Sequence, residues 1–302
     1  MFDAVRSFLF VPGDSEKKIA KALEGSADAL ILDLEDAVAP ENRLRARGLC
    51  LDVLGAQRSK PLVVRMNGLR TPDARPDLAA VLRGCPDGIM LPKCAGLDDV
   101  KLLGHYLDVL EAREGLEAGR TAILPIITET AAAILAGASY REGHPRLTAM
   151  LWGGEDLAAD LGASRNRGHD RAYTSPYLAA RSLCLFAAVS ASAVGIDAVY
   201  TDFRDGGGLR AEAAEALHDG FGSKAAIHPA QVDIINDVFT PDPETIARAE
   251  AIVSVLAGGK TVAVLDGRLV EAPHLKAARK IIARSALVSG SRTKGGAEPQ
   301  LT

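Results

Sequence analysis

The chain has 302 residues, of which 48% are hydrophobic and 25% are charged, and its 35 Lys and Arg against 39 Asp and Glu give a net charge of −4. This composition excludes a disordered chain, a collagen-like repeat and a low-complexity protein. It provides no chain-wide positive charge for nucleic acid or an acidic membrane surface, so we expect a small-molecule partner. The length fits two domains or one large α/β barrel with an appendage.

The cysteines and the N-terminus indicate the compartment. None of the four cysteines stands in a Cys-x-x-Cys pair, which argues against a zinc site or a disulfide framework and favours free thiols. The first residues lack a basic segment followed by an apolar one, and no apolar run approaches the roughly 18 residues of a membrane-spanning helix. We therefore expect a soluble, cytoplasmic protein.

Eight short apolar runs recur along the chain up to residue 227. They cover residues 7–11, 29–32, 62–64, 88–91, 123–127, 149–152, 198–200 and 225–227. The runs are continuous rather than alternating, as in parallel strands buried on both faces, and the gaps can hold a helix each. Helices are expected from Pro40 and over residues 97–114 and 176–194, with a polar loop over 164–175. This pattern predicts an α/β fold, a TIM (β/α)8 barrel over residues 1–230.

The strand rhythm stops after Pro229. We expect a helix to Val238, a second helix to about Ala257, a hairpin over residues 261–270 that turns at Asp266–Gly267, and a further helix from Pro273. Residues 231–288 are therefore predicted to form an appended C-terminal module. Residues 289–302 contain almost no apolar side chains and are predicted to be a disordered tail.

Polar residues follow the apolar runs, where the carboxyl ends of barrel strands meet on one face. Glu129 follows the fifth run and Asp156 the sixth, so their carboxylates should approach each other at the barrel mouth. A Mg²⁺ ion would relieve their repulsion and leave coordination positions for substrate. Gly153 and Gly154 would let a ligand come close, and Gly154, Glu155 and Asp156 are predicted to contact it. The alternative is a pair of surface acids neutralised by local Arg or Lys.

Two cations follow other runs. Arg65 presents a planar, permanently charged fork suited to a carboxylate or a developing enolate oxygen, although it could instead be a buried partner of Asp33 or Glu35. Lys93 is expected to orient the acids through Glu35 or to act directly in catalysis. His228 is interpreted as structural. Gly206 to Gly208 form only a weak phosphate-binding signal, because three glycines also make a plain turn.

The strand-end motifs resemble those of a known family. They are RSFLFVPG at residues 6–13, LDLEDAV at 32–38, VRMN at 64–67, LPK at 91–93, GEDL at 154–157 and AIHPAQ at 226–231. In this order they resemble the citrate lyase β-subunit family, which includes malyl-CoA and citramalyl-CoA lyases and belongs with the HpcH/HpaI aldolases. The resemblance runs from about residue 6 to 287.

The resemblance implies a Mg²⁺-dependent carbon–carbon lyase that cleaves a 3-hydroxyacyl-CoA into acetyl-CoA and a 2-oxo acid. Glu129 and Asp156 match the metal ligands, with one Mg²⁺ per subunit, and Arg65 matches the substrate-binding arginine. The resemblance also implies a homotrimer or hexamer in which the C-terminal module is a lid over a neighbouring barrel, with Asp266 as its inserted acid. Glu35–Asp36 stands where HpaI-type pyruvate aldolases carry a histidine after the glutamate, which favours the thioester-lyase branch.

The phosphates of CoA would need cations at the barrel rim. The candidates are Arg6, Lys17, Lys18, Lys21, Arg165 and Arg167. Three other interpretations remain open: the β subunit of a multi-subunit citrate lyase with a carrier-bound citryl thioester, a malyl-CoA thioesterase, and a metal-binding scaffold without catalysis.

Overall fold

The computed structural model describes residues 2–169 and 171–295, and its centre is a sheet of eight parallel strands. The strands are β1 (Ser7–Pro12), β2 (Ala29–Asp33), β3 (Leu62–Arg65), β4 (Gly88–Leu91), β5 (Ala122–Pro125), β6 (Ala149–Leu151), β7 (Val194–Asp197) and β8 (Ser223–Ala226). They lie in the order β5-β4-β3-β2-β1-β8-β7-β6. Two isolated bridges, Ile123 to Leu147 and Ile126 to Leu151, join the outer strands, so the sheet forms a nearly closed barrel. The predicted TIM-barrel class is confirmed.

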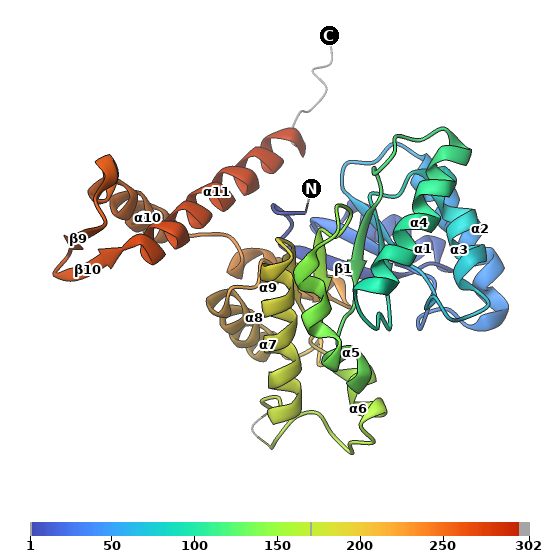
Figure 1. Cartoon of the computed structure of the whole chain (residues 1–302). Helices are drawn as coiled ribbons and strands as arrows, with labels where there is room; N and C mark the ends of the chain where they lie inside the picture. The colour runs from blue at the N-terminus through green and yellow to red at the C-terminus, as the bar shows by residue number, and fades with distance from the viewer. Residues whose placement is uncertain (1, 170, 296–302) are drawn as a thin grey trace, which may run out of the picture.

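Helices cover the outside of the barrel (Figure 1). They are α1 (Glu16–Glu24), α2 (Arg43–Gly55), α3 (Ala74–Val81), α4 (Leu97–Glu114), α5 (Ala131–Leu135), α6 (Glu155–Asp160), α7 (Ser175–Ser190), α8 (Gly206–Asp219) and α9 (Pro229–Val238). Single 3₁₀ turns lie at Pro40–Asn42, Leu82–Gly84 and Ala257–Gly259, and a longer one at Gly137–Glu142. One apolar cluster fills the barrel and another lies between strands and helices. Burial on both faces explains why the strands read as continuous apolar runs.

The seventh strand lies earlier than predicted. It spans Val194–Asp197 rather than residues 198–200, and α7 ends at Ser190 rather than at residue 194. The strand contains Gly195 and ends in the charged Asp197, so it lacks an apolar run of its own. Asp197 is nevertheless fully buried, because three side chains bond its carboxylate.

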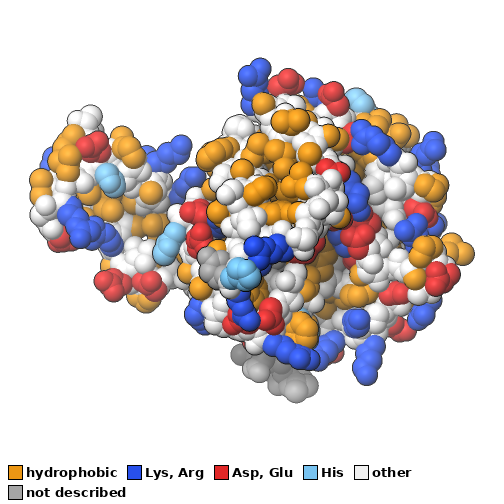
Figure 2. Space-filling view, turned by 90° about the horizontal axis from the view of Figure 1, so that it is seen from below, with side chains coloured by type: hydrophobic (Ala, Val, Ile, Leu, Met, Phe, Trp, Pro, Cys, Tyr) orange, Lys and Arg blue, Asp and Glu red, His pale blue; other side chains and the backbone are white. Residues whose placement is uncertain are grey.

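The C-terminal residues form an arm that projects from the barrel (Figure 1). It consists of α10 (Pro243–Val255), the antiparallel strands β9 (Val262–Leu265) and β10 (Arg268–Glu271), and α11 (Ala272–Gly295). The predicted hairpin is confirmed, and its turn residues Asp266 and Gly267 have φ of 50° and 73°. Figure 2 shows the arm as a separate lobe, with acidic and basic side chains interspersed on the visible face.

The predicted module boundaries differ from the elements. Residue 230 falls within α9, whose Val232 and Ile235 are buried in the outer core, so the last barrel helix runs to Val238. α11 continues to Gly295, so residues 289–295 are helical rather than disordered. The rest of the predicted tail, 296–302, lies outside the described residues. Among the helices of the described part of the chain, none has the length and apolar character needed to cross a membrane.

Candidate active site

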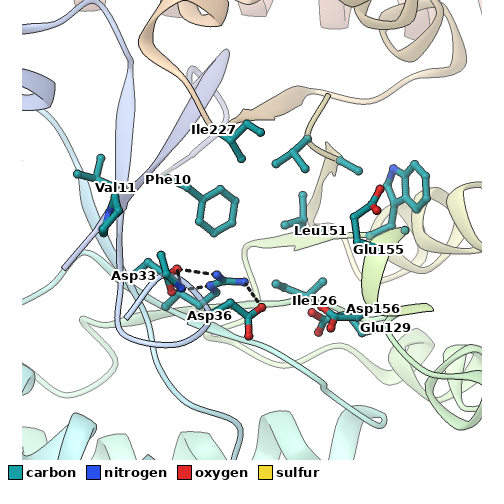
Figure 3. A pocket seen from close by; sticks show the side chains of 18 of the residues that line it. Phe10, Val11, Asp33, Asp36, Ile126, Glu129, Leu151, Glu155, Asp156 and Ile227 are labelled. Carbon is teal, nitrogen blue, oxygen red and sulfur yellow. Dashed lines mark hydrogen bonds and ion pairs between the residues drawn. The ribbon is translucent and has the colours of Figure 1, made fainter. Parts of the chain in front are cut away.

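A pocket of about 420 Å³ opens at the carboxyl ends of the barrel strands, on the predicted face (Figure 3). Its lining combines apolar side chains with charged groups. The lining residues are Phe10, Val11, Pro12, Asp33, Asp36, Ala37, Arg65, Ile126, Glu129, Leu151, Trp152, Gly153, Gly154, Glu155, Asp156, Tyr173, Ala198, Val199 and Ile227.

Glu129 and Asp156 lie side by side at one wall of this pocket (Figure 3). Glu129 follows β5 and is 2% exposed, while Asp156 is in the first turn of α6 and is partly exposed. The backbone N–H of Lys93 donates to Glu129 Oε2. Burial raises the pKa of Glu129 well above its ordinary value, and the neighbouring Asp156 carboxyl raises it further, against the opposing hydrogen bond from Lys93.

This pair fits a hard divalent cation. Two adjoining carboxylates in a buried place repel each other unless one takes up a proton or a cation lies between them. Carboxylate oxygens are the donors that Mg²⁺ prefers, and Mg²⁺ commonly takes one or two of them from the protein. Among the described residues no group of three or more His, Cys, Asp or Glu is placed to hold a metal ion, so this pair can supply two side-chain donors.

Gly153 makes room for Glu129. A Cβ at this position would lie 2.8 Å from Glu129 Cγ, closer than real Cβ contacts come. The N–H of Gly153 donates to Thr128 Oγ1 at 3.0 Å, which ties the end of β6 to the end of β5. Gly153 is therefore needed for the position of the Glu129 carboxylate, beyond the ligand access that we predicted for it.

Arg65 lines the same pocket as the carboxylate pair and is held by acids. Its Nε and Nη2 donate to the two oxygens of Asp33 at 2.7 and 2.6 Å, and its Nη1 is 3.2 Å from Glu35 Oε2. Burial lowers the pKa of Arg65, but the hydrogen bonds and attraction of the acids outweigh burial and raise it. The guanidinium is thus a buried partner of Asp33, and it also lines the pocket.

Lys93 links the two sides of the site. Its Nζ donates to Glu35 Oε1 at 2.6 Å while its N–H contacts Glu129. Its φ of 53° is uncommon for a residue with a Cβ, and such backbone conformations persist where surrounding contacts fix them. Burial raises the pKa of Glu35, and Arg65 and Lys93 oppose this rise. The contacts match the predicted orienting role of Lys93.

Some of the other predicted site residues line the pocket and others lie on the nearby surface. Gly154 and Glu155 line the pocket, and Glu155 accepts a hydrogen bond from Asn166 at 2.7 Å. Lys17 and Lys18 are exposed near the start of α1, just after the carboxyl end of β1.

Arg6 does not reach the pocket. It precedes β1, at the opposite end of the barrel, and its Nε and Nη2 bind the carboxylate of Asp28, each at 2.8 Å. The predicted contact of Arg6 with CoA is therefore wrong for this geometry. Arg167 is also occupied, since it pairs with Glu212 at 2.7 Å. Asp266 lies at the tip of the arm and not in the pocket lining of its own chain.

Two motifs have structural roles. His228 caps α9: its Nδ1 accepts from the N–H of Ala230, and Gln231 completes a capping box. Gly208 lies in the first turn of α8, and its N–H donates to the capping Asp205 side chain at 2.9 Å. The structural interpretation of His228 and the plain-turn interpretation of the glycines agree with these contacts.

The aromatic part of the pocket was not predicted. Trp152, directly after β6, and Tyr173, in the loop before α7, line the pocket, and their ring centroids are 4.9 Å apart. The chain has a single tryptophan, and it directly precedes Gly153–Gly154, which was the available signal.

Fold and pocket together define a (β/α)8 barrel with an acidic pair and an arginine at the strand ends, where barrel enzymes carry their active sites. A family model described as HpcH/HpaI aldolase/citrate lyase matches residues 6–229. The chain belongs to this family, as the strand-end motifs indicated.

Known proteins are similar in sequence to nearly the whole chain. A (3S)-malyl-CoA thioesterase of Cereibacter sphaeroides is 36% identical over 95% of this chain and 96% of its own length. The mitochondrial citramalyl-CoA lyase of Rattus norvegicus is 32% identical over 92% of this chain and 85% of its own length. The crystal structure of CitE from Mycobacterium tuberculosis in complex with magnesium, acetoacetate and coenzyme A has a TM-score of 0.78 at 32% identity, covering 94% of this chain and 99% of that chain.

Proposed function

We propose that the protein is a Mg²⁺-dependent carbon–carbon lyase that cleaves a 3-hydroxyacyl-CoA of the malyl-CoA or citramalyl-CoA type into acetyl-CoA and a 2-oxo acid. The observation that supports this most is the adjacent pair Glu129 and Asp156 in the same pocket as the acid-paired Arg65. Two of the relatives named above, a thioesterase and a lyase, are named for CoA-thioester substrates, and CitE was crystallised with both magnesium and coenzyme A.

Glu129 and Asp156 would hold the Mg²⁺. When bound, the ion supplies Lewis-acid chemistry and a template for the carboxylate and keto oxygens of the 2-oxo acid. The protein side chains supply the two hard oxygen donors, and Lys93 fixes one of them through its N–H. With two donors from the protein, the remaining coordination positions of the ion would be left to substrate.

Arg65 would stabilise the charge that develops on the thioester. Cleavage of the bond between carbons 2 and 3 leaves its electron pair on carbon 2, as an enolate with negative charge on the thioester oxygen. A guanidinium that Asp33 already holds in place can donate to that oxygen without reorganising. Glu35, which contacts both Arg65 and Lys93, would help to fix the position of Arg65 relative to Glu129.

Two proton movements complete the reaction: the 3-hydroxyl loses its proton, and carbon 2 of the enolate gains one. We assign this acid–base role to Asp266 of a neighbouring copy in a trimer or hexamer, because the arm places Asp266 away from its own pocket. Lys17 and Lys18 remain candidates for the CoA phosphates.

A thioesterase is the second candidate, since a malyl-CoA thioesterase is 36% identical over nearly the whole chain. Hydrolysis breaks the bond between carbon and sulfur rather than the one between carbons 2 and 3. The same pocket could bind the substrate for either reaction, so the products must decide.

The experiment is product analysis by mass spectrometry. Malyl-, citramalyl-, β-methylmalyl- and citryl-CoA are incubated with the protein in Mg²⁺ or in EDTA, with Asp156→Asn as the matched variant. The proposal expects acetyl-CoA and a 2-oxo acid from malyl- or citramalyl-CoA, only with Mg²⁺ and only from the wild type. Free CoA without any 2-oxo acid would support the thioesterase, and equal formation of the 2-oxo acid in Mg²⁺ and in EDTA would contradict the Mg²⁺-dependent lyase.

A further inference from the structure

Trp152 and Tyr173 form an aromatic wall of the pocket, next to Glu155 and Asp156. The two rings meet nearly edge to face, at 71° between their planes, and are 1% and 8% exposed. Gly154 packs against both: a Cβ there would lie 3.1 Å from Trp152 and 3.5 Å from Tyr173. The wall therefore adjoins the carboxylate pair that the proposed function uses.

Trp152 is fixed from the barrel side. Its Nε1 donates to Asp197 Oδ1 at 2.8 Å, and the other oxygen of Asp197 accepts from Lys224 Nζ at 2.6 Å. Arg181 from α7 adds a third contact to Asp197 at 3.0 Å. Buried charges of this kind are stable only when fully paired, so the indole has little freedom to move.

Tyr173 is fixed from the loop side. Its backbone pairs with that of Arg167 in an antiparallel bridge, and the Arg167 guanidinium lies 3.7 Å from the centre of the Tyr173 ring. Arg167 Nη1 then donates to Glu212 Oε2 of α8 at 2.7 Å. The cation thus contacts the tyrosine ring and is itself held by a carboxylate.

Glu212 joins the two sides. Its Oε1 accepts from Lys224 Nζ at 3.0 Å, and Lys224 is the residue that pairs with Asp197. A continuous chain of charged contacts therefore runs from the loop, through α8 and β8, to the tryptophan. Among these residues only Trp152 and Tyr173 line the pocket.

We propose that Arg167 and Glu212 are positioning residues, whose ion pair holds Tyr173 against Trp152, and that the resulting wall limits the size of the acyl group that the pocket accepts. This inference rests on the proposed function for the identity of the acyl group. Malyl-CoA and citramalyl-CoA differ by one methyl group on carbon 3, a difference that a rigid apolar wall can discriminate by about 10-fold or more.

The test uses Trp152 as a reporter, because it is the chain's single tryptophan. Emission and acrylamide quenching are measured on the protein without ligand, and kcat/KM is measured for malyl-CoA and citramalyl-CoA. The variants are Arg167→Met, Glu212→Gln and Tyr173→Ala. The matched control is Glu215→Gln, an exposed glutamate on the same helix.

Arg167→Met and Glu212→Gln are expected to shift Trp152 emission to the red and to increase its quenching by acrylamide. Both variants should also change the ratio of kcat/KM for malyl-CoA to kcat/KM for citramalyl-CoA at least about fivefold, in the same direction as Tyr173→Ala changes it. Glu215→Gln should match the wild type. Because Glu212 also bonds Lys224, Arg167→Met decides the result if Glu212→Gln does not fold.

Unchanged emission and an unchanged ratio in folded Arg167→Met would overturn the inference. If the wild type cleaves neither thioester, the proposed function fails, but Trp152 emission still decides whether Arg167 and Glu212 position the rings.

Discussion

The carboxyl group of Glu129 depends on a few close neighbours for its position and charge. It is buried between the Lys93 amide and Asp156, and the absence of a Cβ at Gly153 leaves space for its side chain. Burial and the neighbouring Asp156 carboxyl raise its pKa, and a cation between the two carboxylates would relieve their repulsion. Small shifts of this side chain should therefore affect both metal binding and turnover.

Gly153→Ala tests this packing. The added Cβ would lie 2.8 Å from Glu129 Cγ, so the carboxylate must move, and we expect kcat/KM to fall about 10- to 100-fold with the fold intact. Gly48→Ala is the control, because Gly48 lies inside α2 with open space around its Cβ position. It should keep full activity and gain roughly 0.5–1 kcal/mol of stability. Wild-type kinetics in Gly153→Ala would show that Glu129 needs no fixed position.

Residue chemistry at the strand ends could be predicted from the sequence to a useful degree. Arg65, Glu129 and Asp156 line one pocket because parallel strands in a barrel end on one face. Their pairing could not be predicted, since the bond from Arg65 to Asp33 depends on the register between β2 and β3. Arg6 was assigned to CoA from its charge alone, although it precedes its strand rather than following it.

At the scale of elements, a buried ion pair joins α4 to the segment before β6. Arg146 Nη1 and Nη2 donate to the two oxygens of Glu111 at 2.8 and 2.6 Å, and the N–H groups of Gly119 and Thr121 donate to the same carboxylate. Burial by itself raises the pKa of Glu111, but these hydrogen bonds outweigh burial and lower it to about 2.

This pair predicts a pH-dependent contribution to stability. A carboxyl whose pKa is lowered by folding stabilises the protein above its unfolded value, and that contribution is lost as the pH falls from about 4.5 toward 2. Glu111→Gln should lower the melting temperature at pH 7, and its difference from the wild type should shrink on acidification to pH 3. Exposed Glu117→Gln is the control. A constant difference between wild type and Glu111→Gln across this range would contradict the assignment.

The bounds of a helix or strand could be predicted where the local sequence pattern was strong. α4 has the predicted bounds, Leu97–Glu114, because its apolar spacing is regular and Gly115 ends it in a left-handed conformation. β7 was misplaced because its charged Asp197 is neutralised by Lys224 and Arg181, residues distant in sequence that no local pattern indicates. The same carboxylate also accepts the hydrogen bond of Trp152.

At the scale of the whole molecule, the arm and the barrel are separate lobes (Figures 1 and 2). The hairpin at the end of the arm exposes apolar side chains, including Val264 and Leu269, and its turn presents Asp266. The proposed lid would place these exposed side chains against a second copy of the chain. The sequence predicted the elements of the arm, but not the packing of α10 against α11.

A shared active site predicts complementation between two inactive variants. Asp266→Asn removes the acid but keeps a residue that tolerates the turn's left-handed backbone, and Asp156→Asn removes a proposed metal ligand. Each variant alone should be inactive. Co-expressed chains should regain activity in about a quarter of the sites, since each intact site takes one group from each variant. Wild-type activity in Asp266→Asn alone would assign Asp266 to the turn, and mixed oligomers without any recovered activity would contradict a site shared between two chains.

The central claim is that Glu129 and Asp156 together bind one Mg²⁺, and calorimetric titration of the protein with Mg²⁺ tests it most directly. The wild type should bind one ion per chain, with proton release that grows as the pH is lowered toward the raised pKa of Glu129. Glu129→Gln and Asp156→Asn should each weaken binding at least about tenfold while the protein stays folded. Equal Mg²⁺ affinity in the wild type and both variants would contradict the account.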